Sequence, residues 1–99
     1  MGALHVIACS PDSGAAVQNC LRTAAADDAV VLIGNGVYCA VAGAFSRIAK
    51  RSPTTKWYAL ETDVARRGIA GGFGAGVELI DDSAFVDLVT SHQPIVSWS

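Results

Sequence analysis

The feature that most constrains this chain is an alternation of short apolar runs with stretches of helical periodicity. Five runs have the composition of strands: Leu4–Ala8, Ala29–Ile33, Lys56–Leu60, Val77–Ile80 and Ile95–Trp98. The second is apolar at consecutive positions, as expected of a central parallel strand covered on both faces. Strands that alternate with helices form right-handed crossovers, so we expect a parallel sheet with helices on both faces.

The segments between the strands predict helices. These cover about Gly14–Ala26, a second helix from about Val37 that Gly43 interrupts before Ala44–Arg51, then Thr62–Arg67, and a last helix that begins at Asp82. Thr62 or Asp63 is the expected cap of the third helix. In the last helix, we expect an inward stripe of Phe85, Val86, Leu88 and Val89. The fold class is therefore α/β, with three layers around a five-stranded, mainly parallel sheet.

The length and composition fit one domain over residues 1–99. A chain of 99 residues suffices for a single core, and 52% hydrophobic with 16% charged residues excludes the disordered class. So short a chain cannot hide half of its residues, and we expect an exposed apolar patch that another subunit covers.

Charge and motifs exclude several functions. A net charge of −2 argues against direct nucleic-acid binding, and no apolar run reaches the ~18 residues that span a bilayer, so we expect no membrane partner. Neither G-x-G-x-x-G nor the P-loop pattern occurs in the sequence. A nucleotide-binding function is therefore supported only by analogy with other proteins of the same fold class. His5 lies inside the first strand, where a hydrogen-bonded core histidine is favoured over a catalytic base.

The sequence has three cysteines, Cys9, Cys20 and Cys39, without a C-x-x-C pair. The odd number and the spacing disfavour a disulfide scaffold and a zinc site, and they fit a reducing cytoplasm. Cys9 ranks first as a nucleophile because it follows a strand and precedes a helix, whose dipole lowers a thiol pKa. Cys20 lies on the apolar stripe of the first predicted helix, where a buried small hydrophobe is favoured, and the position of Cys39 early in the second is ambiguous.

The sequence also resembles the TusB/DsrH family of sulfur-relay subunits over nearly its whole length. The landmarks that carry the resemblance, in order, are Leu4-His5, Ser10-Pro11, Cys20-Leu21, Asn35-Gly36-Val37-Tyr38, Ala40, Ala42-Gly43, Trp57-Tyr58-Ala59-Leu60, Asp63, Ala65-Arg66-Arg67-Gly68, Asp81, Phe85-Val86-Asp87-Leu88 and Trp98. Asn35 stands where an acidic residue is common in the family, which weakens any electrostatic role at that position.

This resemblance implies a flavodoxin-like subunit of a cytoplasmic heterohexamer with TusC/DsrF-like and TusD/DsrE-like proteins and a TusE/DsrC-like acceptor. It implies that sulfur passes as a cysteine persulfide, without a cofactor or metal, toward 2-thiolation of wobble uridine in tRNA or through sulfur oxidation. The cysteine typical of the DsrH side corresponds to Cys20, so the resemblance favours Cys20 as the persulfide carrier and leaves Cys9 as the alternative. A non-catalytic structural subunit of the same complex is the rival function. Alone, the chain could form a homo-oligomer.

Overall fold

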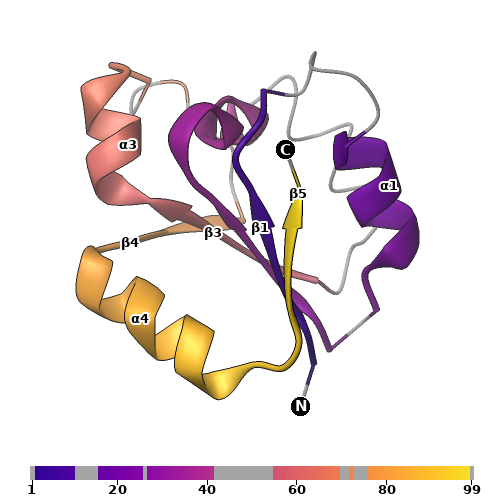
Figure 1. Ribbon diagram of the computed structural model, residues 1–99. Helices are drawn as coiled ribbons and strands as arrows, with labels where there is room; N and C mark the ends of the chain where they lie inside the picture. The colour runs from indigo at the N-terminus through magenta and orange to yellow at the C-terminus, as the bar shows by residue number, and fades with distance from the viewer. Residues whose placement is uncertain are drawn as a thin grey trace.

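Five parallel strands and the helices on their two faces make up the fold (Figure 1). The computed structural model describes residues 2–10, 16–25, 27–41, 55–69, 72 and 76–98. The strands are β1 (Leu4–Ile7), β2 (Ala29–Leu32), β3 (Lys56–Leu60), β4 (Val77–Ile80) and β5 (Ile95–Trp98). The helices are α1 (Ala16–Thr23), the 3-10 helix η1 (Gly34–Ala40), α3 (Glu61–Arg66) and α4 (Asp82–Ser91).

The strand order in the sheet is β4-β3-β2-β1-β5, and every neighbouring pair is parallel. β2 is the central strand, and all four of its residues are buried, which confirms the prediction from its continuous apolar run. β5 returns to pair with β1, in a register that sets Ile7 opposite Trp98. The first strand and the end of the chain are thus neighbours.

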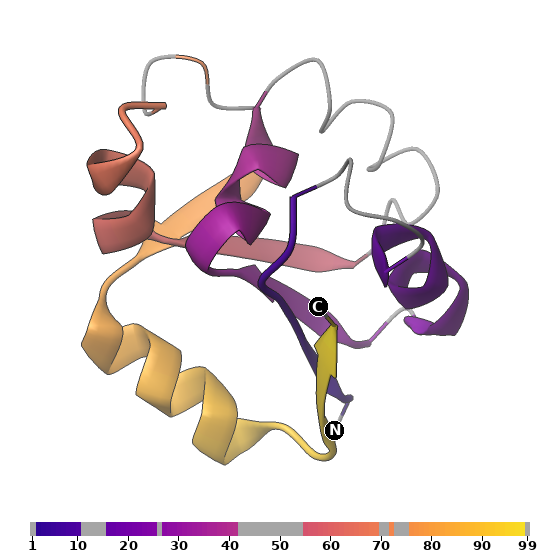
Figure 2. The ribbon, with the colours of Figure 1, turned by 45° about the horizontal axis from the view of Figure 1, so that its top comes forward.

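The path of the chain explains which helix covers which face. From β1 to β4 the strands advance in one direction, and right-handed crossovers then place α1, η1 and α3 on one face. The return from β4 to β5 reverses direction and places α4 on the other face, as Figures 1 and 2 show. The prediction of a three-layer, flavodoxin-like α/β fold is confirmed.

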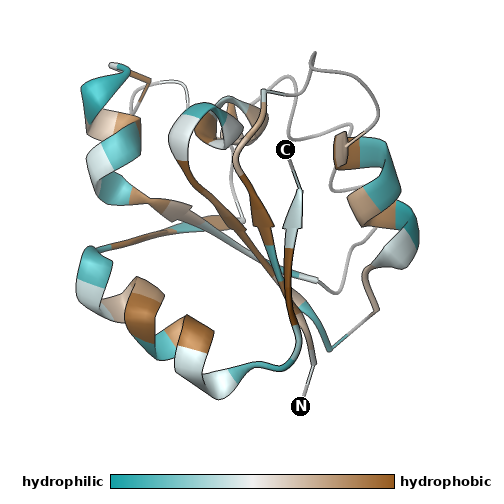
Figure 3. Ribbon diagram, in the orientation of Figure 1, coloured by the Kyte–Doolittle hydropathy of each residue, from teal (hydrophilic) through white to brown (hydrophobic). Residues whose placement is uncertain are grey.

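Two apolar clusters hold the layers together. Under α1, η1 and α3 lies the larger cluster, which includes Ile7, Leu32 and Trp57. Under α4 lies the smaller, built on Leu4, Val6, Ala29, Val31 and Ile80. Figure 3 shows the hydrophobic residues along the strands and on the side of α4 that faces the sheet.

Two helices begin earlier than the sequence predicted. η1 begins at Gly34 rather than near Val37, and it is a 3-10 helix. α3 begins at Glu61, directly after β3, and no side chain caps it, so the expected capping by Thr62 or Asp63 is wrong. The Asp63 carboxylate instead accepts a hydrogen bond from the Gly34 backbone N–H. The predicted helical stretch Ala44–Arg51 lies outside the described residues.

α4 follows its predicted pattern with one exception. Asp81 precedes the helix and accepts a hydrogen bond from the Ala84 N–H at 2.8 Å, a typical N-cap. Phe85, Leu88 and Val89 pack against the smaller cluster. Val86, which was expected on the same stripe, is 57% exposed, because the ~100° step from Phe85 turns it away from the sheet.

Candidate functional site around the cysteines

Cys9 lies two residues beyond the end of β1, at the edge of the sheet where the parallel strands end. It is partly exposed and packs against the larger apolar cluster. The expected proximity of Cys9 to the start of α1 depends on residues 11–15, which lie outside the described part of the chain. Partial exposure at a strand end is the arrangement that an accessible nucleophile requires.

Cys20 projects from α1 into the larger cluster and has no exposed surface. Burial, with smaller contributions from the charges of Asp28 and of a Cys9 thiolate, raises the pKa of its thiol to about 12. Both effects suppress the thiolate, which is the reactive form. The prediction of a buried small hydrophobe at this position is confirmed, and in this conformation Cys20 lacks the access that the resemblance to sulfur carriers implies.

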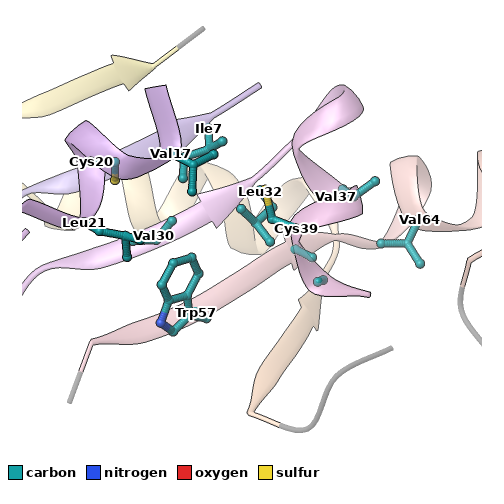
Figure 4. Packing of buried hydrophobic residues seen from close by; sticks show 12 residues of the cluster. Ile7, Val17, Cys20, Leu21, Val30, Leu32, Val37, Cys39, Trp57 and Val64 are labelled. Carbon is teal, nitrogen blue, oxygen red and sulfur yellow. The ribbon is translucent and has the colours of Figure 1, made fainter. Parts of the chain in front are cut away.

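Cys39 is also completely buried, but it projects from η1 into another part of the cluster. Figure 4 shows Cys20 near Val17 and Leu21, whereas Cys39 lies near Leu32 and Val37. No disulfide joins the three cysteines, all of which belong to the described residues. Of the three cysteines, Cys9 alone is not fully buried.

Three side chains form a hydrogen-bonded chain in which His5 and Asp28 are buried and Trp98 is partly buried. The Trp98 indole Nε1–H donates to Nδ1 of His5 at 3.1 Å, and Nε2 of His5 lies 2.8 Å from Oδ2 of Asp28. An indole nitrogen is only a donor, so Nδ1 must be the acceptor and His5 must be neutral with its proton on Nε2. Both ring nitrogens are occupied, which confirms that His5 is a satisfied core histidine and leaves it no nitrogen to deprotonate a cysteine.

Asp28 anchors this chain just before β2. Burial on its own would raise the pKa of its carboxyl group, but hydrogen bonds from the Ala25 N–H, from His5 and from the Ala3 N–H outweigh that effect and lower the pKa below 3.8. The ionised carboxylate therefore ties together the segments before β1 and before β2. Sequence reasoning missed this network, although a histidine at a buried strand position signals that a polar partner must be nearby.

A second polar network joins α3 to the residues after β2. Asp63 accepts from the Gly34 N–H at 2.8 Å, and its carboxylate lies 3.6 Å from Nη1 of Arg67. Nε of Arg67 in turn donates to Oδ1 of Asn35 at 3.2 Å. Asn35, where the sequence departs from the family pattern, thus takes part as a neutral hydrogen-bond acceptor.

The ends of β3 and β4 are unsuited to a nucleotide. Their following helices lie on opposite faces, the arrangement at which doubly wound proteins bind ligands. However, the residues directly after these strands include the exposed Glu61, Asp81 and Asp82, and carboxylates repel phosphate. In the described ranges, no group of three or more His, Cys, Asp or Glu residues could hold a metal ion, and no helix is long and apolar enough to cross a membrane.

The fold and the site define a small parallel α/β protein whose candidate chemistry is that of thiols. The family described as "DsrH like protein" matches residues 9–95, and the chain belongs to this family. It is 34% identical over 96 residues to a protein TusB of Klebsiella pneumoniae and 32% identical over 96 residues to a protein TusB of Enterobacter sp.; each match covers 96% of this chain and 99% of the relative.

Two solved structures share the fold. The crystal structure of the ychN protein from E. coli superposes with a TM-score of 0.79 at 15% identity, covering 98% of this chain and 99% of that one. The solution structure of protein Tm0979 from Thermotoga maritima gives a TM-score of 0.67 at 30% identity, covering 90% and 92% of the two chains.

Proposed function

We propose that this chain is a subunit of a cytoplasmic sulfur-relay complex and that Cys9 receives and passes on persulfide sulfur. The membership of the DsrH-like family and the TusB relatives support the sulfur-relay assignment. The single observation that carries the choice of residue is the partial exposure of Cys9 at the end of β1. The sulfur would serve 2-thiolation of wobble uridine in tRNA or sulfur oxidation.

The choice of Cys9 reverses the ranking that the family resemblance implies. A carrier must be reached by the sulfur of another protein and must ionise near neutral pH. Cys20 has no exposed surface and a pKa raised to about 12, so a donor persulfide cannot approach its thiol without movement of the surrounding chain. Cys20 remains the second candidate for a state of the protein in which α1 has moved.

The proposed chemistry is thiol exchange in two steps. The Cys9 thiolate attacks the outer sulfur of a donor persulfide, R–S–SH; the S–S bond of the donor breaks, RS⁻ leaves, and Cys9–S–SH forms. An acceptor thiolate then attacks the outer sulfur of Cys9–S–SH, which releases the Cys9 thiolate. No net oxidation occurs, so the transfer requires no metal or organic cofactor.

The surface is suited to assembly with other subunits. Four large hydrophobic residues are exposed in the described part of the chain: Tyr38, Leu79, Val86 and Ile95. α4 contributes no fully buried residue, although its apolar stripe contacts the sheet. We expect TusC/DsrF-like and TusD/DsrE-like subunits to cover part of this surface in a heterohexamer, and a TusE/DsrC-like protein to accept the sulfur.

A second candidate function is that of a non-catalytic structural subunit of the same complex. The complete burial of Cys20 and Cys39 favours it, because two of the three thiols are then packing residues. In that case, the main role of the chain is to contact other subunits through its exposed apolar side chains, and Cys9 takes no part in sulfur transfer.

Mass spectrometry after incubation with a persulfide donor separates the two functions. The proposal predicts a gain of one sulfur atom that is lost in Cys9→Ser and retained in the matched control Cys39→Ser. An unlabelled wild-type protein that still assembles with its partner subunits would establish the structural role instead. Label that persists in Cys9→Ser and vanishes in Cys20→Ser would return the carrier role to Cys20.

A further inference from the structure

We propose that the indole of Trp98, held in place by neutral His5, is a gate that controls access to the buried thiol of Cys20. The gate would limit the access of any thiol-reactive reagent to Cys20, whether or not a persulfide forms on the protein. It assigns a role to the Trp98–His5–Asp28 chain, which the proposed sulfur transfer does not use.

The position of Trp98 supports this role. α1, which carries Cys20, packs against both β1 and β5, and Figures 1 and 2 show it beside these strands. Trp98 ends β5, is only partly buried, and packs against the same apolar cluster that contains Cys20. Trp98 therefore covers part of this cluster on the face of the sheet where α1 packs against β1 and β5.

The bond from Trp98 to His5 keeps this ring in place. The rings of His5 and Trp98 are stacked, with their centroids 6.2 Å apart at an angle of 25°, and the indole N–H reaches Nδ1 of His5. Among the described strands, β5 lies at the edge of the sheet and pairs with β1 alone. The hydrogen bond from the Trp98 side chain therefore reinforces the backbone pairing of β5 with β1 at the end of the strand, where an edge strand frays most easily.

The orientation of His5 is set from the other side by Asp28. The carboxylate binds Nε2 of His5 and the backbone N–H groups of Ala3 and Ala25, so it cannot turn away without leaving these donors unpaired. The imidazole is thus held with Nδ1 toward the indole. The charge of Asp28 also contributes to the raised pKa of the Cys20 thiol.

The three cysteines provide the readout for a test. Cys9 is accessible in the native state, Cys20 lies under the proposed gate, and Cys39 is equally buried beneath η1 in another part of the cluster. Local opening at β5 exposes Cys20 but not Cys39, whereas global unfolding exposes both. Each site can be followed by alkylation and peptide mass spectrometry.

Trp98→Phe removes the N–H but keeps an aromatic ring on β5. We expect alkylation of Cys20 to accelerate about fivefold, the change in an opening equilibrium that corresponds to one hydrogen bond, while the Cys39 rate changes little. His5→Gln offers an amide oxygen to accept from the indole and an amide N–H to donate to Asp28, so it should retain most of the protection of Cys20.

Three results would overturn the proposal. The first is an unchanged Cys20 rate in Trp98→Phe, and the second is an equal acceleration of Cys20 and Cys39, which would indicate loss of global stability. The third comes from nitrogen NMR of the wild-type His5 ring, which should show the Nε2–H tautomer; a proton on Nδ1 at neutral pH would contradict the bond on which the gate depends.

Discussion

The carboxylate of Asp63 accepts a hydrogen bond from the backbone N–H of Gly34 at 2.8 Å, across 29 positions of sequence. This bond joins α3 to the first residue of η1, at the edge where β2 and β3 end. It satisfies a helix-terminal N–H group that η1 itself cannot pair. The position of η1, and with it the cover over Cys39, therefore depends on a residue of another helix.

Asp63→Ala should destabilise the protein by about 1–3 kcal/mol, because the Gly34 N–H loses a charged acceptor in a partly buried setting. The exposed Asp87 on α4 is the matched control, and Asp87→Ala should change the free energy of unfolding by no more than ~0.5 kcal/mol. Urea unfolding followed by circular dichroism measures both. Equal effects of the two substitutions would show that the Asp63 bond contributes little.

Gly36→Ala should be strongly destabilising because η1 begins in direct contact with the end of β1. A Cβ atom on Gly36 would overlap the carbonyl oxygen of Ile7 and lie 2.8 Å from its carbonyl carbon, and a buried backbone cannot easily shift. Overpacking of this kind costs ~1–3 kcal/mol or more.

The control for this substitution is Gly72→Ala, since no heavy atom of the described residues lies within 4 Å of a Cβ built at Gly72. Thermal unfolding should show a lower melting temperature for Gly36→Ala and a nearly unchanged one for Gly72→Ala. A Gly36→Ala protein as stable as the wild type would mean that β1 and η1 are not in the close contact that Gly36 makes with Ile7.

Asp28 should make stability depend on pH in the acid range. Its pKa in the folded protein is lowered below 3.8, so the carboxylate contributes stability above that pH, and the contribution is lost as the pH falls through the folded-state pKa. Asp28→Asn cannot titrate. The difference in unfolding free energy between wild type and Asp28→Asn should therefore be largest at neutral pH and shrink below pH 3.8.

Denaturant unfolding at a series of pH values measures this difference, with the exposed Asp87→Asn as control. A gap between wild type and Asp28→Asn that stays constant into strong acid would show that the hydrogen bonds to Asp28 do not depend on its charge.

Local sequence patterns predicted the strands and much of the core, whereas the polar networks required the structure. The continuous apolar run of β2 and the stripe of Val17, Cys20 and Leu21 on α1 report burial directly, because periodicity reflects which face is covered. The bond between His5 and Trp98 joins residues 93 positions apart. It exists because β5 returns beside β1, and no local pattern specifies that return.

The difference between local patterns and long-range contacts also explains which features of the candidate site could be predicted. The apolar stripe correctly predicted that Cys20 is buried, while the family resemblance favoured it as the reactive residue. Cys9 was ranked first from its place after a strand, and its partial exposure agrees with that argument. The network of Asp63, Asn35 and Arg67 was not predicted, because its members come from segments that meet only at the edge of the folded sheet.

The most direct test of the account is to locate the sulfur on the wild-type protein after brief exposure to a persulfide donor. Trapping by alkylation, digestion and tandem mass spectrometry assign the added sulfur to one of the three cysteines. The account predicts a persulfide on the peptide that contains Cys9, with Cys20 and Cys39 modified only after local or global opening. Sulfur found first on Cys20, while Cys9 remains unmodified, would contradict it.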